Sequence, residues 1–323
     1  MNLTGIPDWE PAISALQEAK KVSIACHFNP DGDALGSLLA ASLGLRSLGK
    51  ETFPSFGNNP AKIPFGYDFL PGADGILQPG ELPRGGVFLA LDCGAIGRLG
   101  ALEPLVSASS TTINVDHHPG NDNFGTFNIV ATDASSTAEI VTRILQALDV
   151  QLDASMATCL YTGINTDTGS FQYSNSSPDT LRLAADLLAL GVDAPFISQQ
   201  VYESSPFGFL KLVGRVLDRA VLHEKERFIY SFYTRKDLEE TGVAADETDK
   251  LMDMIRSTRA ADVAGLFKEQ SDGKYRVSMR SKGPVSVGEV ARKRGGGGHE
   301  LAAGFTADDV EGTVQSILPE LRG

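Results

Sequence analysis

The chain has 323 residues, of which 42% are hydrophobic and 21% charged, a composition typical of a globular protein with room for two domains. Its net charge of −13 argues against binding to a long nucleic-acid duplex, and the chain has no apolar run of the about 20 residues that a membrane helix requires. The first residues, Met1–Pro11, lack the basic-then-apolar order of a signal peptide, so we expect a cytoplasmic protein without a membrane partner.

Predicted strands and helices alternate through the first half of the chain. Three apolar runs predict buried strands that each lead directly into an acidic or imidazole side chain: Val22–Cys26 before His27, Val87–Leu91 before Asp92, and Thr112–Val115 before Asp116. Helices are expected over Trp9–Lys20, Leu38–Leu48, Ser135–Leu148, Ala154–Asn165 and from Pro178 to Gly191, with Asp8, Asp153 and Ser177 as N-caps. The alternation predicts an α/β fold with a parallel, doubly wound sheet, whose strand ends meet at one edge.

A smaller α+β domain is predicted for the last part of the chain. Pro195 and Pro206 interrupt the helical pattern of residues 193–220, which we interpret as a connector. Beyond it, the alternating run Arg227–Thr234 predicts a strand, and Ser271–Gly273 predicts the turn of a hairpin between residues 261–268 and 274–280. Further helices are expected over Asp246–Ser257, Val287–Arg294 and Asp308–Leu321. The predicted domains therefore span residues 1–192 and 221–323.

The stretch from His27 to Ser37 carries the first sign of chemistry. His27, Asp31 and Asp33 fall in a tight turn at the end of a predicted strand, where Pro30 and Gly32 allow side chains two residues apart to converge. Two carboxylates and an imidazole held together repel unless a cation compensates them, which indicates half of a metal site. A single His-x-x-x-Asp-x-Asp stretch is more often a solvated turn, so the interpretation depends on the other strand ends.

Those strand ends supply further candidate ligands. The full set is His27, Asp31, Asp33, Asp92, His117 and Asp167. Four carboxylates and two imidazoles exceed what one open divalent site needs, but they suit two ions that share a carboxylate and a hydroxide able to attack phosphorus. No cysteine pair is spaced for zinc, and the donors favour Mn²⁺ or Mg²⁺ over Zn²⁺ or Co²⁺. Asp116 is then expected to orient a ligand imidazole, and His118 to donate to the substrate phosphate. Taken singly, Asp92 could be a cap and Asp167 a residue of a helix C-terminal turn.

A glycine run in the second domain is a candidate phosphate-binding loop. Gly295–Gly298 precede His299 and Glu300, and a helix that begins there would direct a positive dipole end at a phosphate. Basic residues flank the run, in Arg280–Lys282 and Arg292–Arg294. Glycine runs are more often flexible linkers, but this one lies inside a compact domain.

These motifs together resemble those of a known family. His27–Ser37, Leu91-Asp92, Asp116–His118 and Gly163–Gly169 resemble the four motifs of the DHH phosphoesterases, and Gly295–His299 resembles the signature of the DHH-associated carboxyl-terminal domain. The resemblance covers nearly the whole chain and is closest to the nanoRNase / pAp phosphatase group. It implies hydrolysis of very short RNAs, such as pApA, to 5′-mononucleotides, and of 3′-phosphoadenosine 5′-phosphate (pAp) to AMP and phosphate.

The resemblance also implies roles for individual residues. It implies one ion on His27, Asp31 and Asp92, and a second on Asp33, Asp92, His117 and Asp167, with Asp92 bridging. His118 and Arg98 would contact the substrate phosphates. Across a cleft between the domains, the far end of the substrate would be held by Arg280, Gly297, Gly298 and His299. The implied cofactors are two divalent ions, most often Mn²⁺, with Mg²⁺ or Co²⁺ as alternatives.

Two other functions stay open at this point. The first is hydrolysis of cyclic dinucleotides or another phosphate ester, which only a comparison of substrates can decide. The second is a nucleotide-binding regulator without turnover, against which the complete set of candidate ligands argues. The expected partner is a short single-stranded RNA or a nucleotide. A homodimer is compatible with the sequence, which leaves the oligomeric state open.

Overall fold

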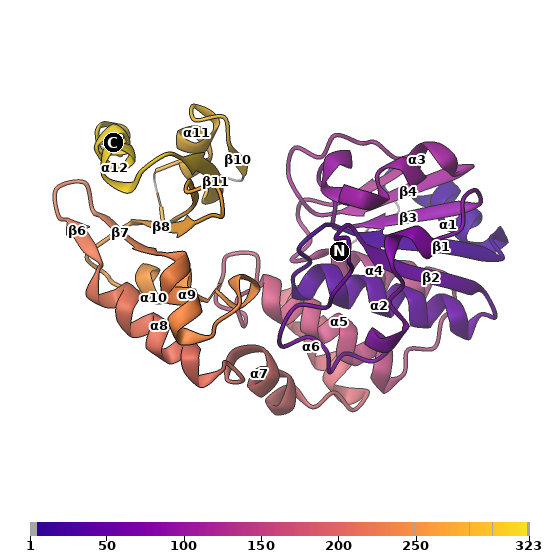
Figure 1. The fold of residues 1–323 in the computed structure, drawn as a ribbon. Coiled ribbons are helices and arrows are strands. Elements are labelled where there is room, and N and C mark those ends of the chain that lie inside the picture. Colours follow the sequence, from indigo (N-terminus) through magenta and orange to yellow (C-terminus); the bar gives the residue numbers. More distant parts are fainter. Residues whose placement is uncertain (1–4, 249, 284, 299, 322–323) are drawn as a thin grey trace. The chain divides into compact units, whose positions relative to one another are not determined.

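The computed structural model describes residues 5–248, 250–283, 285–298 and 300–321. It consists of two compact units, residues 1–204 and 205–323 (Figure 1). The first unit is an α/β domain and the second is built on a mixed sheet. This is the predicted fold class.

The sheet of the first unit has five parallel strands in the order β2-β1-β3-β4-β5. The strands are β1 (Lys21–Cys26), β2 (Glu51–Phe56), β3 (Val87–Leu91), β4 (Thr111–Asp116) and β5 (Phe127–Val130). The predicted strands correspond to β1, β3 and β4, whereas β5 was not predicted. Asp8, the expected cap of the first helix, instead accepts a hydrogen bond from the Asn128 N–H of β5 (2.8 Å).

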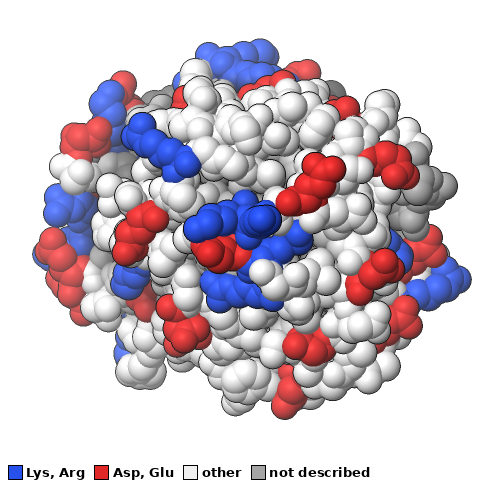
Figure 2. Space-filling model, turned by 90° about the vertical axis from the view of Figure 1, so that its right-hand side faces the viewer, with Lys and Arg blue, Asp and Glu red and all other residues white. Residues whose placement is uncertain are grey.

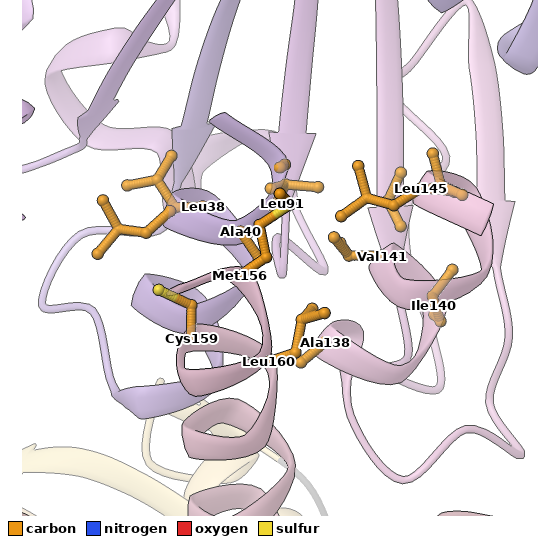
Figure 3. Close-up of a cluster of buried hydrophobic side chains, with 14 of the residues drawn as sticks. Leu38, Ala40, Leu91, Ala138, Ile140, Val141, Leu145, Met156, Cys159 and Leu160 are labelled. Atoms are coloured by element: carbon orange, nitrogen blue, oxygen red, sulfur yellow. The ribbon is translucent and has the colours of Figure 1, made fainter. Parts of the chain in front are cut away.

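Helical segments cover both faces of this sheet. The helices of the first unit are α1 (Trp9–Glu18), α2 (Gly32–Ser47), α3 (Pro104–Ala108), α4 (Thr137–Ala147), α5 (Ala154–Asp167), α6 (Pro178–Ala189) and α7 (Ala194–Tyr202). In β3, Leu89 and Leu91 pack into the large core beneath α2, α4 and α5, while Phe88 and Ala90 pack on the opposite face, with Leu102. This alternation is the period of two that places successive side chains on opposite faces. Figure 3 shows the large core, in which Leu91 of β3 lies among side chains of α2, α4 and α5.

The helix predicted from Leu38 begins six residues earlier, inside the motif. Asp31 caps α2 because its Oδ1 accepts hydrogen bonds from the N–H groups of Asp33 (3.1 Å) and Ala34 (3.0 Å). Helix α2 then packs closely against α5, and two glycines of α2 make that approach feasible. A Cβ at Gly32 would lie 2.4 Å from Oγ1 of Thr166, and one at Gly36 would lie 2.3 Å from the Cys159 carbonyl oxygen.

The second unit contains a six-stranded sheet in the order β10-β11-β9-β8-β7-β6, in which β7 and β8 are parallel and the other neighbours antiparallel. The strands are β6 (Val221–His223), β7 (Phe228–Tyr233), β8 (Val263–Glu269), β9 (Tyr275–Ser281), β10 (Gly297–Gly298) and β11 (Ala302–Ala307). The helices are α8 (Phe207–Asp218), α9 (Arg235–Thr241), α10 (Leu251–Arg256), α11 (Val287–Arg292) and α12 (Val310–Ile317). The predicted β8–β9 hairpin is confirmed.

The prediction for Pro195 and the prediction for the glycine run Gly295–Gly298 were wrong. Pro195 does not interrupt a helix, because it lies in the first turn of α7. The helical pattern is interrupted at residues 203–206, between α7 and α8, where Pro206 is the N-cap residue of α8. A proline at a helix start loses no intrahelical hydrogen bond, since the first N–H groups have no partner in the helix. No helix begins at the glycine run in the described residues; the run follows the end of α11 and leads into the β10–β11 pair.

None of the helices in the described part of the chain has the length and apolar character needed to cross a membrane. Figure 2 shows one face of the molecule, on which Lys and Arg side chains are interspersed with Asp and Glu side chains and with uncharged surface.

Candidate active site

The predicted ligands converge at the carboxyl edge of the parallel sheet. His27 follows β1, Asp92 follows β3, and His117 follows β4. Asp31 and Asp33 lie at the beginning of α2, and Asp167 is the last residue of α5. The close α2–α5 packing therefore brings the end of α5 to the strand ends.

Asp92 is the central residue of the cluster. Its Oδ2 lies 3.4 Å from Nε2 of His27, while its Oδ1 lies 3.8 Å from Nε2 of His117 and 3.5 Å from Nδ1 of His118. The residue is 3% exposed and has a φ of +59°, in the left-handed region that non-glycine residues adopt infrequently. Backbone strain at a buried carboxylate is a common feature of functional sites. Each oxygen of Asp92 thus faces a different imidazole.

Donor atoms gather in three groups, within each of which the atoms lie no more than 4.8 Å apart. The groups are His27 with Asp31 and Asp92, Asp33 with His117 and Asp167, and Asp92 with His117 and His118. In the second group, Nε2 of His117 lies 3.6 Å from Oδ2 of Asp167. Oxygen and imidazole donors without thiolates suit Mn²⁺ and Mg²⁺.

The beginning of α4 holds two of these carboxylates in place. The N–H groups of Thr137 (2.7 Å) and Ala138 (2.9 Å) donate to the two oxygens of Asp33, and the Thr137 hydroxyl donates to Oδ1 of Asp92 (2.9 Å). Thr137 was not among the predicted site residues. The pattern Ser136-x-x-Glu139, which is typical of a helix start, could have indicated it. The first N–H groups of a helix have no partner within the helix and are therefore available to a carboxylate.

Asp116, which is buried, and His118, which is partly exposed, form a hydrogen-bonded pair beside the cluster. Nδ1 of His118 donates to Oδ1 of Asp116 (2.7 Å), and the amide of Asn121 donates to Oδ2 of Asp116 (2.6 Å). Asp116 was expected to orient a ligand imidazole; the imidazole that it contacts is that of His118, which is not one of the predicted metal ligands. The alternation of side chains along extended backbone explains why Asp116 contacts His118 and not His117. Asp116 is the last residue of β4, and the side chain two positions further on, that of His118, points to the same side of the chain.

The charges of the cluster explain why it needs a cation. Burial raises the pKa of Asp33, and the negative charge of Asp92 raises it further. Burial, followed by the charges of Asp31 and Asp92, raises the pKa of Asp167 to about 8. Burial by itself would raise the pKa of Asp92. The hydrogen bond with His27 and the positive charges of His118, His27 and His117 together outweigh burial, so the pKa falls well below the usual range. Divalent cations would offset this repulsion, so the donor set fits the metal ions that it was predicted to hold.

Two basic groups lie beside the carboxylates. Burial would lower the pKa of His118, but the hydrogen bond to Asp116 and the charge of Asp92 raise it to about 9. The exposed Arg98 lies in a 3₁₀ helix over Ile96–Leu102 and its guanidinium stacks on the ring of Phe28, 4.8 Å from the centroid. Phe28 directly follows His27, so the stacking holds the Arg98 side chain beside the cluster.

The predicted residues of the second unit lie at one end of its sheet. Arg280 of β9 pairs in register with Ala302 of β11, and Gly298 of β10 pairs with Ala303. A Cβ at Gly296 would lie 2.2 Å from the Gly304 carbonyl oxygen, and one at Gly298 would lie 2.5 Å from the Ala302 carbonyl oxygen. Close strand packing therefore accounts for these two glycines, while Gly297 is exposed. His299 lies outside the described residues.

Family profiles match both units. The profile of the DHH family, N-terminal domain, matches residues 21–164, and the profile of the DHHA1 domain matches residues 225–322. The chain is 33% identical over 304 residues to the bifunctional oligoribonuclease and PAP phosphatase NrnA of Thermus thermophilus, covering 93% of this chain and 89% of that protein. It is 30% identical over 305 residues to the protein of the same name from Bacillus subtilis, covering 91% of this chain and 93% of that protein.

Solved structures show the same fold. An exopolyphosphatase-related protein from Bacteroides fragilis superposes with a TM-score of 0.88 at 24% identity, covering 98% of each chain. RecJ from Thermus thermophilus, in complex with Mn²⁺, superposes with a TM-score of 0.57 at 16% identity, covering 99% of this chain and 54% of that one. With both family domains present and relatives at 30% identity or more aligned over most of their length, the chain belongs to the DHH family of phosphoesterases, hydrolases of phosphoester bonds.

Proposed function

We propose that this chain is a two-metal phosphoesterase that hydrolyses short oligoribonucleotides to 5′-mononucleotides and pAp to AMP and phosphate. The observation that carries the proposal is the position of Asp92, whose two oxygens face the imidazoles of His27 and His117 in two different donor groups. We infer the proposed substrates from the names of the relatives, which are bifunctional oligoribonucleases and PAP phosphatases.

In this proposal two of the three donor groups each hold one ion. The group of His27, Asp31 and Asp92 holds the first ion, the group of Asp33, His117 and Asp167 holds the second, and Asp92 is shared between the two ions. Two bound ions would lower the pKa of a water molecule and offset the charge of the phosphate. We propose Mn²⁺, with Mg²⁺ or Co²⁺ as alternatives, because the donors are carboxylates and imidazoles.

The remaining residues act on the substrate phosphate. Asp116 holds Nδ1 of His118, which leaves Nε2 as the atom that donates to a phosphate oxygen. Stacking on Phe28 restricts the Arg98 guanidinium, which supplies a second donor to the same anion. Both groups carry positive charge where negative charge develops during hydrolysis, which is the requirement for stabilising a phosphoryl transition state.

We propose that the second unit binds the other end of the substrate through Arg280, Gly297, Gly298 and His299. Support comes from the β9–β11–β10 register, which brings Arg280 and Gly298 to one end of a sheet. An Arg280→Ala variant should raise the KM for pApA with a smaller change in kcat, because a group distant from the reacting phosphate contributes to binding. An unchanged KM would remove Arg280 from the proposal.

A substrate panel tests the function. The purified chain should release AMP from pApA and phosphate from pAp in the presence of Mn²⁺, and chelation should abolish both reactions. Mg²⁺, Co²⁺ and a cyclic dinucleotide complete the panel. Hydrolysis of the cyclic dinucleotide alone would replace the proposed substrates, and hydrolysis that survives chelation would refute the metal mechanism.

An Asp92→Asn variant tests the shared carboxylate. It keeps the size of the side chain but removes the charge, so Mn²⁺ should no longer raise the melting temperature and hydrolysis should fall by at least about a thousandfold. Asp186→Asn, an exposed position on α6, is the matched control and should behave as the unmodified chain. Full activity of the Asp92→Asn variant would contradict the assignment.

A further inference from the structure

Helix α8 carries an exposed apolar stripe in addition to its buried face. Phe209, Leu212 and Val216 are buried and anchor the helix in the second unit. On another face, Phe207 is 71% exposed, Leu210 59% and Leu217 46%. An amphipathic helix at a protein surface normally has one apolar face, so a second one indicates a contact with another surface.

The spacing of the stripe is that of a helix–helix seam. Phe207, Leu210, Gly214 and Leu217 follow one another along α8 at intervals of three, four and three residues. At its middle, a Cβ on Gly214 would meet nothing within 4 Å, so the helix backbone is accessible there. A hollow of about 790 Å³ runs alongside; it is lined by Phe207, Gly208, Lys211, Gly214, Arg215, Asp218, Glu240 and Thr241.

We propose that this stripe is a homodimer interface, in which α8 packs antiparallel against α8 of a second copy with the two-fold axis beside Gly214. Two-fold symmetry requires a surface that is complementary to itself. The apolar stripe meets that requirement, since Leu210 and Leu217 lie at similar distances on either side of Gly214. A glycine at the crossing point permits close approach of the two backbones.

The charges beside the stripe are also self-complementary. Lys211 and Asp218 are seven residues apart and therefore on the same side of α8. At about 1.5 Å per residue, Lys211 lies about 4.5 Å before Gly214 and Asp218 about 6 Å after it, so the two-fold axis sets Lys211 opposite the partner's Asp218. Arg215, between them, is already paired within its own chain with Glu240 (2.7 Å) and Asp237 (3.1 Å). The dimer therefore contains two contacts between opposite charges. This charge complementarity favours a second copy of this chain as the partner that covers the stripe.

The first test is the mass of the full chain in solution. Sedimentation should show a dimer, and Leu210→Glu should weaken it by at least about tenfold, because a buried apolar contact becomes an unpaired charge. Leu181→Glu, at a leucine of α6 that is 51% exposed, is the matched control and should remain dimeric. A monomeric unmodified chain, or a Leu210→Glu variant that dimerises normally, would overturn the proposal.

A charge exchange tests the arrangement of the two helices. Lys211→Glu and Asp218→Lys should each be monomeric, since each places like charges opposite one another twice. Mixing the two variants should restore a dimer, because both contacts are then again between opposite charges. Both positions are exposed, so neither variant is expected to affect folding. No recovery in the mixture would refute the antiparallel arrangement.

A disulfide locates the axis. Gly214→Cys should cross-link the dimer under mild oxidation, because the two introduced thiols face each other at the axis, whereas Lys236→Cys, at an 80% exposed side chain of α9, should not. The native cysteines Cys26, Cys93 and Cys159 are buried and give little background. Cross-linking that is no faster at position 214 than at position 236 would place the interface elsewhere and overturn the proposal.

Discussion

The contact between α2 and α5 can be tested with one methyl group. In a Gly36→Ala variant the new Cβ would lie 2.3 Å from the Cys159 carbonyl oxygen and 3.0 Å from the Gly163 nitrogen. A carbon–oxygen contact needs about 3.3 Å, so the two helices must separate by about 1 Å. Overpacking of this kind costs about 1–3 kcal/mol, and the better helix propensity of alanine offsets about 1 kcal/mol, which leaves a net loss of stability of at most about 2 kcal/mol.

The effect on hydrolysis should be larger than the effect on stability. Asp167 ends α5, so a helix displaced from α2 moves this carboxylate away from Asp33 and His117. A displacement of about 1 Å at reacting groups can cost about a hundredfold in rate. We therefore expect the Gly36→Ala variant to fold, with a modestly lower urea midpoint, and to hydrolyse pAp about a hundredfold more slowly with Mn²⁺.

A second glycine of the same helix provides the control. A Cβ at Gly44 would lie 2.5 Å from a methyl carbon of Leu145, at the flexible end of a side chain that can rotate away. The Gly44→Ala variant should therefore keep its rate of hydrolysis. If Gly36→Ala hydrolyses pAp as fast as the unmodified chain, the position of α5 does not control the site and the reasoning fails.

Three further predictions concern the site itself. Thr137→Val removes the hydroxyl donor to Asp92 and should weaken Mn²⁺ binding about ten- to a hundredfold by calorimetry, while Thr137→Ser should keep it; equal affinities would show that the hydrogen bond is dispensable. Asp116→Asn should lower the pKa of His118 from about 9 in the metal-free protein, followed by NMR, and an unchanged titration would contradict the pairing. Because the pKa of Asp167 is raised to about 8, this carboxyl is protonated at neutral pH without metal, and Mn²⁺ must displace the proton. Mn²⁺ affinity should therefore rise up to about tenfold per pH unit below pH 8 and flatten above it, and a pH-independent affinity would refute this.

The local sequence pattern was sufficient to predict where several strands end and which residues cap two of the helices. The predicted strand Val87–Leu91 coincides with β3, and Asp153 and Ser177 cap α5 and α6 through their side chains. These features depend on neighbours within about four residues, as apolar runs and capping hydrogen bonds do.

Features that depend on distant residues were not predictable. Asp33 accepts hydrogen bonds from residues 104 and 105 positions away in the sequence, at the beginning of α4. The start of α2 was predicted too late because the capping role of Asp31 is hidden in a motif that also suggested a metal ligand. The glycine run was interpreted as a helix start, whereas Gly296 and Gly298 are required by the close approach of β11.

The sequence by itself determined which side chains meet at the site. Imidazoles and carboxylates at the ends of parallel strands converge wherever the sheet forms, because all strands of such a sheet end at one edge. Only the tertiary structure decided how they are arranged: that Asp92 lies between His27 and His117, that Asp116 holds His118, and that α5 reaches the edge at all. The reason is physical, since a hydrogen bond or a helix–helix contact is decided by distances of a few tenths of an ångström between residues far apart in the chain, and no local pattern encodes these.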